Sequence, residues 1–140
     1  MQVKIKLLHD GIMPTKKTAG AAAYDCYARE DVIVKEEPVL IGLGFALELP
    51  DGYHAEIVPR SSIGLNTNLR QPNCVGVIDS DYRGEIKVPL FNQSSVSQTI
   101  EKGERIAQLM FLPVPEVNFV TPEEYKALSR GDGGLGSTGK

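Results

Sequence analysis

Residues 75–91 read VGVIDSDYRGEIKVPLF, and this stretch decides the kind of fold that the chain can adopt. Two apolar runs, 75–78 and 85–91, stand on either side of a turn that carries two aspartates, a tyrosine and an arginine. Apolar runs joined by a short polar turn predict a β-hairpin. The charge in the turn has two interpretations: it is a solvated hairpin, or it is a site that aligns a ligand and a water molecule.

Strand-like runs recur on both sides of this stretch, about every ten residues, which favours an all-β barrel or sandwich. The other predicted strands cover residues 3–8, 32–34, 39–49, 53–58, 96–100 and 105–112. Gly42 and Gly44 predict a bulge or bend inside the run 39–49. Pro50-Asp51-Gly52 predicts a turn, because proline and glycine preset the backbone dihedrals.

Two short helices and a tail complete the predicted architecture. Thr121-Pro122-Glu123-Glu124 is a capping box with proline at the first helical position, so we expect a helix over residues 122–128. A second short helix can follow Arg60. Residues 131–140 are rich in glycine, serine and threonine, which is typical of a flexible tail.

Length and charge exclude several classes of protein. The 140 residues fit one domain, and the net charge of −3 argues against a general nucleic-acid binder. No apolar run approaches the ~18 residues of a membrane span, and the N-terminus lacks the core of a signal peptide. Cys26 and Cys74 lie among apolar residues and are predicted to be buried free thiols, which suits a reducing compartment. We therefore expect a cytoplasmic protein, in the host cytoplasm if the chain is viral.

Three segments carry polar side chains whose role the residues alone leave open. Residues 60–62, Arg-Ser-Ser, end a predicted strand, where the serines either cap a helix or hold a phosphate together with the arginine. Asp25 lies among small and aromatic residues and is expected to be partly buried with a partner. It is either a turn cap or a carboxylate near a magnesium ion that substrate phosphates hold. Gln108 is either structural or a ligand contact, and His9 and His54 receive no role.

The tail contains two patterns that we reject. Residues 134–140 match the phosphate-binding loop G-x-x-x-x-G-K, but nothing in the sequence supplies the helix that such a loop needs. Arg130-Gly131-Asp132 spells a cell-adhesion tripeptide, which we interpret as chance. Glycine backbones can still form an anion nest, so the tail is either a mobile end or a flap that closes over a ligand.

Five segments together resemble, in order and spacing, the motifs of the trimeric dUTPases, the deoxyuridine triphosphate nucleotidohydrolases. They are AAAYDCYA at 21–28, PRSSIGL at 59–65, NCVGVIDSDYRGEI at 73–86, GERIAQLMF at 103–111 and RGDGGLGSTG at 130–139. The segments span almost the whole chain, and the third and the fifth are the most specific.

The resemblance implies an all-β fold, a distorted jelly-roll-like β-barrel of the β-clip type, that assembles as a homotrimer with active sites at the subunit interfaces. It implies a barrel domain over residues 1–129 and a glycine-rich tail over 130–140 that closes the active site. The implied reaction is hydrolysis of dUTP to dUMP and pyrophosphate with Mg²⁺. This reaction limits uracil incorporation into DNA and supplies dUMP for dTMP synthesis.

The resemblance also implies a role for each site residue. Asp79 matches the acid that activates the attacking water, and Tyr82 matches the aromatic ring that leaves no room for a 2′-hydroxyl. Asn73 matches the residue that reads the uracil edge, and Asp25 matches the acid that reaches the metal through water. The other implied substrate-binding positions are Gly76, Val77 and Ile78 near the base, Arg60, Ser61, Ser62 and Gln108 at the phosphates, and Arg130, Leu135, Gly136, Ser137 and Thr138 in the tail.

Three positions depart from the family pattern, and two other functions remain alternatives. Leu135 stands where the family usually has phenylalanine, Ala23 where it has glycine, and Cys26 where it has leucine. A positive φ at position 23 would strain alanine. The alternatives are the related dCTP deaminases, which share the fold and the trimer, and a non-catalytic trimer that senses nucleotides or binds proteins. The IDSDY stretch fits the hydrolase.

Overall fold

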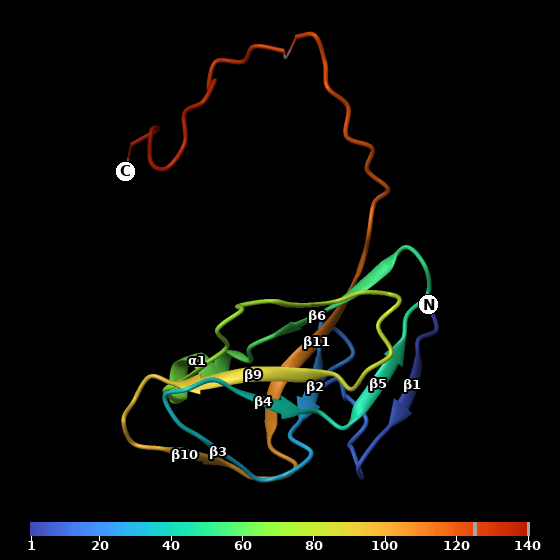
Figure 1. Ribbon diagram of the computed structural model, residues 1–140, viewed down its shortest axis with the longest axis vertical. Coiled ribbons are helices and arrows are strands. Elements are labelled where there is room, and N and C mark those ends of the chain that lie inside the picture. The colour runs from blue at the N-terminus through green and yellow to red at the C-terminus, as the bar shows by residue number, and fades with distance from the viewer. Residues whose placement is uncertain (125, 140) are drawn as a thin grey trace.

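The computed structural model describes residues 1–124 and 126–139, which are built almost entirely of short strands (Figure 1). In chain order the elements are β1 (Lys4–Leu7), β2 (Tyr24–Tyr27), β3 (Val32–Val34), β4 (Val39–Gly42), β5 (Phe45–Glu48), β6 (Tyr53–Val58), α1 (Ser61–Asn66), β7 (Leu69–Arg70), β8 (Gly76–Ile78), β9 (Lys87–Asn92), β10 (Gln98–Ile100) and β11 (Arg105–Pro113). Within the described residues, no helix is long and apolar enough to cross a membrane.

Hydrogen bonds join the strands into four antiparallel sheets. Their strand orders are β1–β5, β3–β10, β2–β11–β6–β8 and β4–β9–β7. Strands far apart in the chain pair with each other, as β2 does with β11, so residues distant in sequence meet in one sheet. The described strands thus form an all-β, jelly-roll-like fold, as predicted, although their ladders stay in separate sheets and do not close into one continuous barrel.

The space between the sheets is filled by aliphatic side chains and one phenylalanine. Each of these side chains contributes ~1.5–3 kcal/mol when it is fully removed from water. The largest of them are Phe45, Ile41, Leu43, Ile57, Leu69, Ile86, Leu90, Ile100, Ile106 and Leu109. The core therefore fixes which face of each strand points inward.

The predicted hairpin over residues 75–91 is wrong, although both of its runs are strands. β8 pairs with β6, where Gly76 lies opposite Ile57, whereas β9 pairs with β4 and β7. The turn between them therefore crosses from one sheet to another. Its exit is tied to the β4–β5 bend, because Ile86 N–H donates to the carbonyl of Phe45 at 2.8 Å. Local sequence predicts a strand but not its partner, which long-range packing selects.

The two predicted helices have different outcomes. The helix after Arg60 is confirmed as α1, but its N-cap is Arg60 and makes no side-chain capping bond, so neither serine caps it. The helix predicted over 122–128 is absent from residues 122–124 and 126–128, while Tyr125 lies outside the described residues. An isolated helix of this length is marginal in water without tertiary packing. Here the chain after β11 leaves the body of the protein (Figure 1).

Candidate functional site

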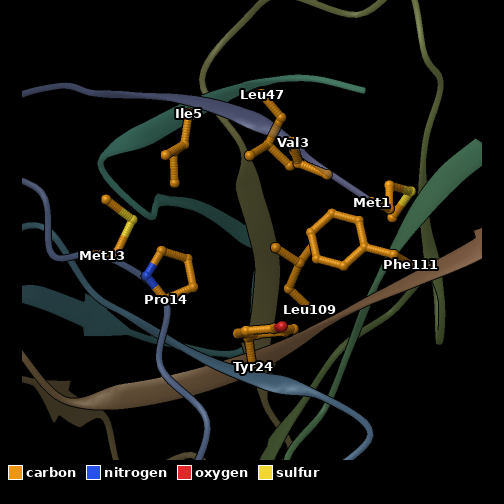
Figure 2. Close-up of a pocket in the computed structure, with 9 residues that line it drawn as sticks. All are labelled: Met1, Val3, Ile5, Met13, Pro14, Tyr24, Leu47, Leu109 and Phe111. Carbon is orange, nitrogen blue, oxygen red and sulfur yellow. The ribbon is translucent and has the colours of Figure 1, made fainter. Parts of the chain in front are cut away.

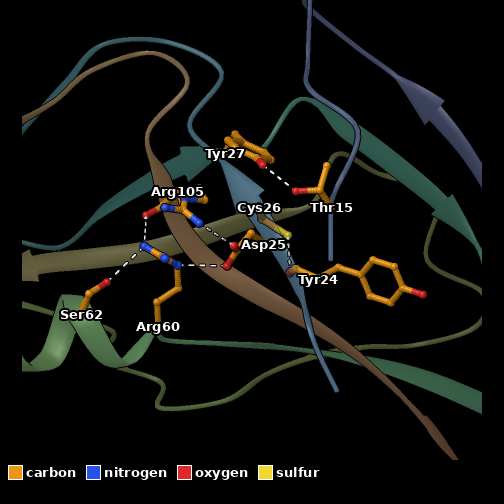
Figure 3. A network of polar contacts seen from close by, with 8 residues as sticks. All are labelled: Thr15, Tyr24, Asp25, Cys26, Tyr27, Arg60, Ser62 and Arg105. Atoms are coloured by element: carbon orange, nitrogen blue, oxygen red, sulfur yellow. Dashed lines mark hydrogen bonds and ion pairs between the residues drawn. The ribbon is translucent and has the colours of Figure 1, made fainter. Parts of the chain in front are cut away.

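Asp25 on β2 is almost buried, at 7% exposure, and two arginines hold it (Figure 3). Its Oδ1 accepts a hydrogen bond from Arg60 Nε at 3.0 Å, and its Oδ2 accepts one from Arg105 Nη1 at 3.1 Å. Arg60 follows β6 and Arg105 begins β11, so adjacent strands of the β2–β11–β6–β8 sheet meet at this carboxylate. The prediction that Asp25 is partly buried with a partner is confirmed.

The two arginines keep Asp25 ionised. Burial by itself would raise the pKa of Asp25, but the hydrogen bond from Arg105 and the charge of Arg60 outweigh it and hold the pKa below the usual 3.8. The same burial, reinforced by the charge of Asp25, raises the pKa of the neighbouring Cys26 thiol to about 12. Cys26 is therefore a protonated, unreactive thiol at neutral pH.

A basic pocket opens beside the Asp25 carboxylate. Its lining contains four cationic side chains, Lys16, Lys17, Arg60 and Arg105, against the carboxylates of Asp25 and Glu104. Arg60 Nη1 donates to Ser62 Oγ at 3.1 Å and to the Arg105 carbonyl at 3.2 Å, which fixes the guanidinium in place. The excess of positive charge suits an anionic ligand such as a phosphate chain.

Two other predicted phosphate contacts lie next to this pocket. Gln108 on β11 is the register partner of Asp25, so its half-buried amide stands on the same face of the sheet. Ser61 is exposed at the first residue of α1, directly after Arg60. The structure thus brings together Asp25, Arg60, Ser61, Ser62 and Gln108 at one end of the sheet.

The turn of residues 79–86 forms a second group. Asp79 is exposed directly after β8, and Tyr82 N–H donates to its carbonyl at 3.2 Å. The Tyr82 hydroxyl donates to the Glu85 carbonyl at 3.1 Å. The ring lies against Gly84, because a Cβ at Gly84 would overlap its hydroxyl and leave no room for both. The main chain of Asp79 and the ring of Tyr82 are therefore held in the same turn.

The segment before β8 brings the predicted base-reading residues together. Asn73 Nδ2 lies 3.3 Å from where a Cβ at Gly76 would be, so the amide lies beside open main chain of β8. Cys74 between them is exposed and has a φ of +57°, so the prediction that it is buried is wrong. It stands in a turn, where its N–H donates to the Gln71 carbonyl at 3.0 Å. Ala23, in contrast, does not have a positive φ, so the strain considered for it is absent.

The two groups lie at opposite ends of β6 within one chain. Ile78 pairs with Ala55 near the start of this strand, and Asp79 lines a hollow with Tyr53 and His54. Arg60 follows the other end of β6. His54 and Arg60 are six residue steps apart along extended chain, which is about 20 Å. One chain therefore does not bring Asp79 to the basic pocket.

The predicted tail residues form a third group, away from both others (Figure 1). Arg130, Gly136, Ser137 and Thr138 are exposed, and so is Leu135, which has a φ of +48°. Short turns bend the tail, with Ser137 N–H donating to the Gly134 carbonyl at 3.0 Å.

A further hollow is apolar and holds none of the predicted site residues (Figure 2). Its floor includes Tyr24 and Phe111, whose rings meet edge to face with centroids 5.9 Å apart. Met1, Val3 and Met13 are among the side chains around it. It lacks the charge that a phosphate needs, so the candidate site is the basic pocket with the 79–86 turn.

Two residues that matter to the site were not predicted. Arg105 lies in the fourth motif. The one sequence signal for its role is that the buried carboxylate of Asp25 needs a positively charged partner. Glu85 supplies the acceptor for Tyr82 through its main chain, for which the sequence contains no signal. Within the described residues, no group of three metal-ligating side chains comes together.

The fold and the basic pocket define an all-β protein with a site for an anionic ligand. A family model, dUTPase, matches residues 9–139. Two bacterial deoxyuridine 5′-triphosphate nucleotidohydrolases are similar over nearly their full length. That of Hydrogenobaculum sp. is 47% identical, covering 96% of this chain and 94% of the relative, and that of Nautilia profundicola is 45% identical, covering 100% of both.

A solved structure gives the same result at lower identity. The dUTPase of Staphylococcus bacteriophage 80alpha with dUPNHPP superposes with a TM-score of 0.88 at 27% identity, covering 99% of each chain. The chain therefore belongs to the dUTPase family.

Proposed function

We propose that this chain hydrolyses dUTP to dUMP and pyrophosphate, which limits uracil incorporation into DNA and supplies dUMP for dTMP synthesis. The observation that carries the proposal is the family match along residues 9–139, which includes every residue of the candidate site. The bacterial relatives are named for this reaction, and the phage relative has been solved with dUPNHPP, a deoxyuridine nucleotide. We place the reaction in the cytoplasm, or in the host cytoplasm for a viral chain, because the free buried thiol of Cys26 suits a reducing compartment.

Asp79 is the proposed general base. The water oxygen forms a bond to the α-phosphorus as a water proton passes to the Asp79 carboxylate, and the bond from the α-phosphorus to the bridging oxygen breaks to release pyrophosphate. A base must lie within hydrogen-bond reach of the proton that it takes. The short turn after β8 supports this role, since Asp79 is exposed there and its carbonyl is tied to Tyr82.

The nucleoside is proposed to bind along β8. Asn73 and the main chain of residues 76–78 read the uracil edge, and the Tyr82 ring lies against the deoxyribose and excludes a 2′-hydroxyl. The open main chain at Gly76 beside the Asn73 amide supports this assignment. The position of the Tyr82 ring, bonded to the Glu85 carbonyl, supports the role of a fixed wall.

The phosphates are proposed to bind in the basic pocket and under the tail. Arg60, Ser61, Ser62 and Gln108 contact the phosphate chain from one side. The tail, residues 130–140, is a separate unit from the domain of residues 1–129 and closes over the ligand. In it, Arg130, Ser137 and Thr138 bind the terminal phosphate and Leu135 with Gly136 covers the uracil. Closure of this kind excludes bulk water and tightens the geometry.

Mg²⁺ is the proposed cofactor, and the residues present fit an ion that the substrate carries. Both Asp25 oxygens already accept hydrogen bonds from arginines, which suits contact through water rather than direct ligation. Asp25 would hold the ion's water shell, and the ion would offset phosphate charge in the transition state. Arg60 and Arg105 stand beside it and orient the carboxylate.

The active form is proposed to be a homotrimer whose sites lie between chains. The support is geometric: in one chain, Asp79 and the basic pocket lie about 20 Å apart along β6. A site that contains both therefore needs residues from more than one copy. The exposed tail can reach such a shared site from yet another copy.

The proposed activity is tested by giving the protein Mg²⁺ and, separately, dUTP, dCTP, dTTP and UTP, while pyrophosphate and ammonia release are followed. We expect pyrophosphate from dUTP alone. Ammonia from dCTP would instead place the chain with the deaminases. If no nucleotide gave a product, the remaining interpretation would be a non-catalytic trimer that senses nucleotides or binds proteins.

We expect Asp79→Asn and Arg60→Ala chains to be inactive alone but to regain activity when they are unfolded together and refolded. If one site takes Asp79 and Arg60 from different chains, random mixing leaves about a quarter of the sites intact. The control mixes Asp79→Asn with an Asp79→Asn/Arg60→Ala chain, neither of which carries Asp79, and should stay inactive. Equal activity in the two mixtures would contradict the shared site.

We expect Leu135→Phe to lower the KM for dUTP. Leucine covers a ring face, but an aromatic pair is worth ~0.5–1.5 kcal/mol beyond the area that it buries. The matched control is Leu128→Phe, which adds a ring at another exposed position of the chain after β11. An unchanged KM and turnover in Leu135→Phe would show that position 135 does not cover the base.

A further inference from the structure

The turn that carries Tyr82 is tied to the neighbouring sheet by an ion pair that is mostly buried. Glu85 Oε1 lies 2.8 Å from Arg29 Nε, and the two side chains are 11% and 23% exposed. The same oxygen accepts the N–H of Gly44 at 3.1 Å. Arg29 Nε is buried without a well-directed acceptor among the described residues, so its contact with Glu85 is a contact of charges rather than an aligned hydrogen bond.

The fold keeps space open for this pair. A Cβ at Gly42, the last residue of β4, would overlap Arg29 Nε and Glu85 Oε1. Arg29 N–H also donates to the Gly42 carbonyl at 3.1 Å, so the chain around residue 29 is fixed to the same strand. The pair is thus built into the β4–β5 bend and is not a loose surface contact.

Glu85 connects this bend to Tyr82 through its main chain. The peptide unit of Glu85 and Ile86 is planar, so its two ends move together. At one end, Ile86 N–H donates to the Phe45 carbonyl at 2.8 Å. At the other end, the Glu85 carbonyl accepts the Tyr82 hydroxyl at 3.1 Å. The acceptor for Tyr82 is therefore anchored by a backbone bond on one side and by the Glu85 side chain on the other.

We propose that Arg29 and Glu85 are positioning residues for Tyr82, and that they sharpen the rejection of nucleotides that carry a 2′-hydroxyl. This inference rests on the proposed function, in which the Tyr82 ring is the wall that excludes that hydroxyl. A ring bonded to a fixed carbonyl cannot turn aside, whereas a ring released from it has room for a ribose. Arg29 and Glu85 act through Tyr82 and not through contact with the nucleotide.

The test compares kcat/KM for dUTP and UTP in the full-length protein and in Glu85→Ala. The ratio of the two values in one preparation is independent of the fraction of folded enzyme. We expect Glu85→Ala to lower the ratio about fivefold, which corresponds to the loss of one ordinary hydrogen bond. Glu30→Ala is the matched control, because it removes only the more exposed carboxylate 3.4 Å from Arg29, and it should leave the ratio unchanged.

Two further variants separate positioning from general damage. Tyr82→Phe should lower the ratio by at least the same factor, and the Glu85→Ala/Tyr82→Phe double variant should lower it no further than Tyr82→Phe alone. Both changes act on one contact, which Tyr82→Phe removes and Glu85→Ala loosens by freeing the carbonyl that accepts it. Glu85→Gln keeps an acceptor for Gly44 but removes the charge, so it replaces Glu85→Ala if the alanine variant does not fold.

The outcomes distinguish this inference from the proposed function. A wild-type protein that hydrolyses neither nucleotide would overturn the proposed function itself. A wild-type protein that prefers dUTP, with the same preference in Glu85→Ala and Glu85→Gln, would overturn only the positioning role. Additive effects of Glu85→Ala and Tyr82→Phe would also overturn it.

Discussion

Replacing Asp79 with asparagine is expected to lower kcat for dUTP by a factor of about 10²–10⁴, the contribution of a well-placed general base. Asparagine has nearly the same shape as aspartate but cannot take a proton from water. Since Asp79 is exposed and outside the core, the variant should fold and still bind nucleotide. Steady-state kinetics with dUTP and Mg²⁺ measure the loss, and the melting temperature should remain near that of the wild type.

Asp81→Asn is the matched control for this experiment. Asp81 is exposed in the same turn, two residues further along, and carries the same charge. A general electrostatic effect of the turn would make the two variants equally slow. If Asp79 is the specific base, the kcat of Asp81→Asn stays close to that of the wild type. If Asp81→Asn lost more activity than Asp79→Asn, the assignment of the base would be wrong.

The 75–91 stretch shows which part of the fold a sequence can predict. Alternation and turn residues identify strands, because each strand needs one face for the core, and β8 and β9 both form. The partner of a strand depends on contacts distant in the chain. Gly76 lies opposite Ile57, and Lys87 lies opposite Gly42, which no local pattern encodes. The hairpin prediction therefore failed at pairing and not at strand formation.

For the candidate site too, the sequence predicts some features and not others. The sequence indicates that Asp25 needs a partner, because a buried carboxylate is costly when it stands alone. It does not indicate that the partners are Arg60 and Arg105, which are 35 and 80 residues away. The sequence also does not indicate that Asp79 lies far from this cluster, because that separation follows from the register of β6 against β8. The motifs identify the functional residues, and the pairing of strands in the sheet determines which of these residues lie close together.

Replacing Asp25 with alanine is expected to destabilise the fold by about 3 kcal/mol at neutral pH. Removing one partner of a buried ion pair costs ~3–5 kcal/mol, and the lower end applies because Arg105 reaches solvent. The variant leaves the guanidinium groups of Arg60 and Arg105 close together with no carboxylate between them. Urea unfolding at one fixed protein concentration measures the change, because the stability of an oligomer depends on concentration. Glu48→Ala, which removes the exposed ion pair with Lys4, is the control and should have little effect.

The stabilisation by Asp25 should disappear in acid. The pKa of Asp25 is lowered on folding, so its contribution is fully present above the ordinary value of 3.8 and is lost as pH falls through the lower pKa of the folded state. The difference in unfolding free energy between wild type and Asp25→Asn should therefore be constant from pH 7 to about pH 5 and should shrink below about pH 4. A difference that grew as pH fell from 7 to 5 would instead mean that the folded pKa is raised, because the folded state would then take up the proton before the unfolded state does. In that case, Arg60 and Arg105 would not account for the ionised state of Asp25.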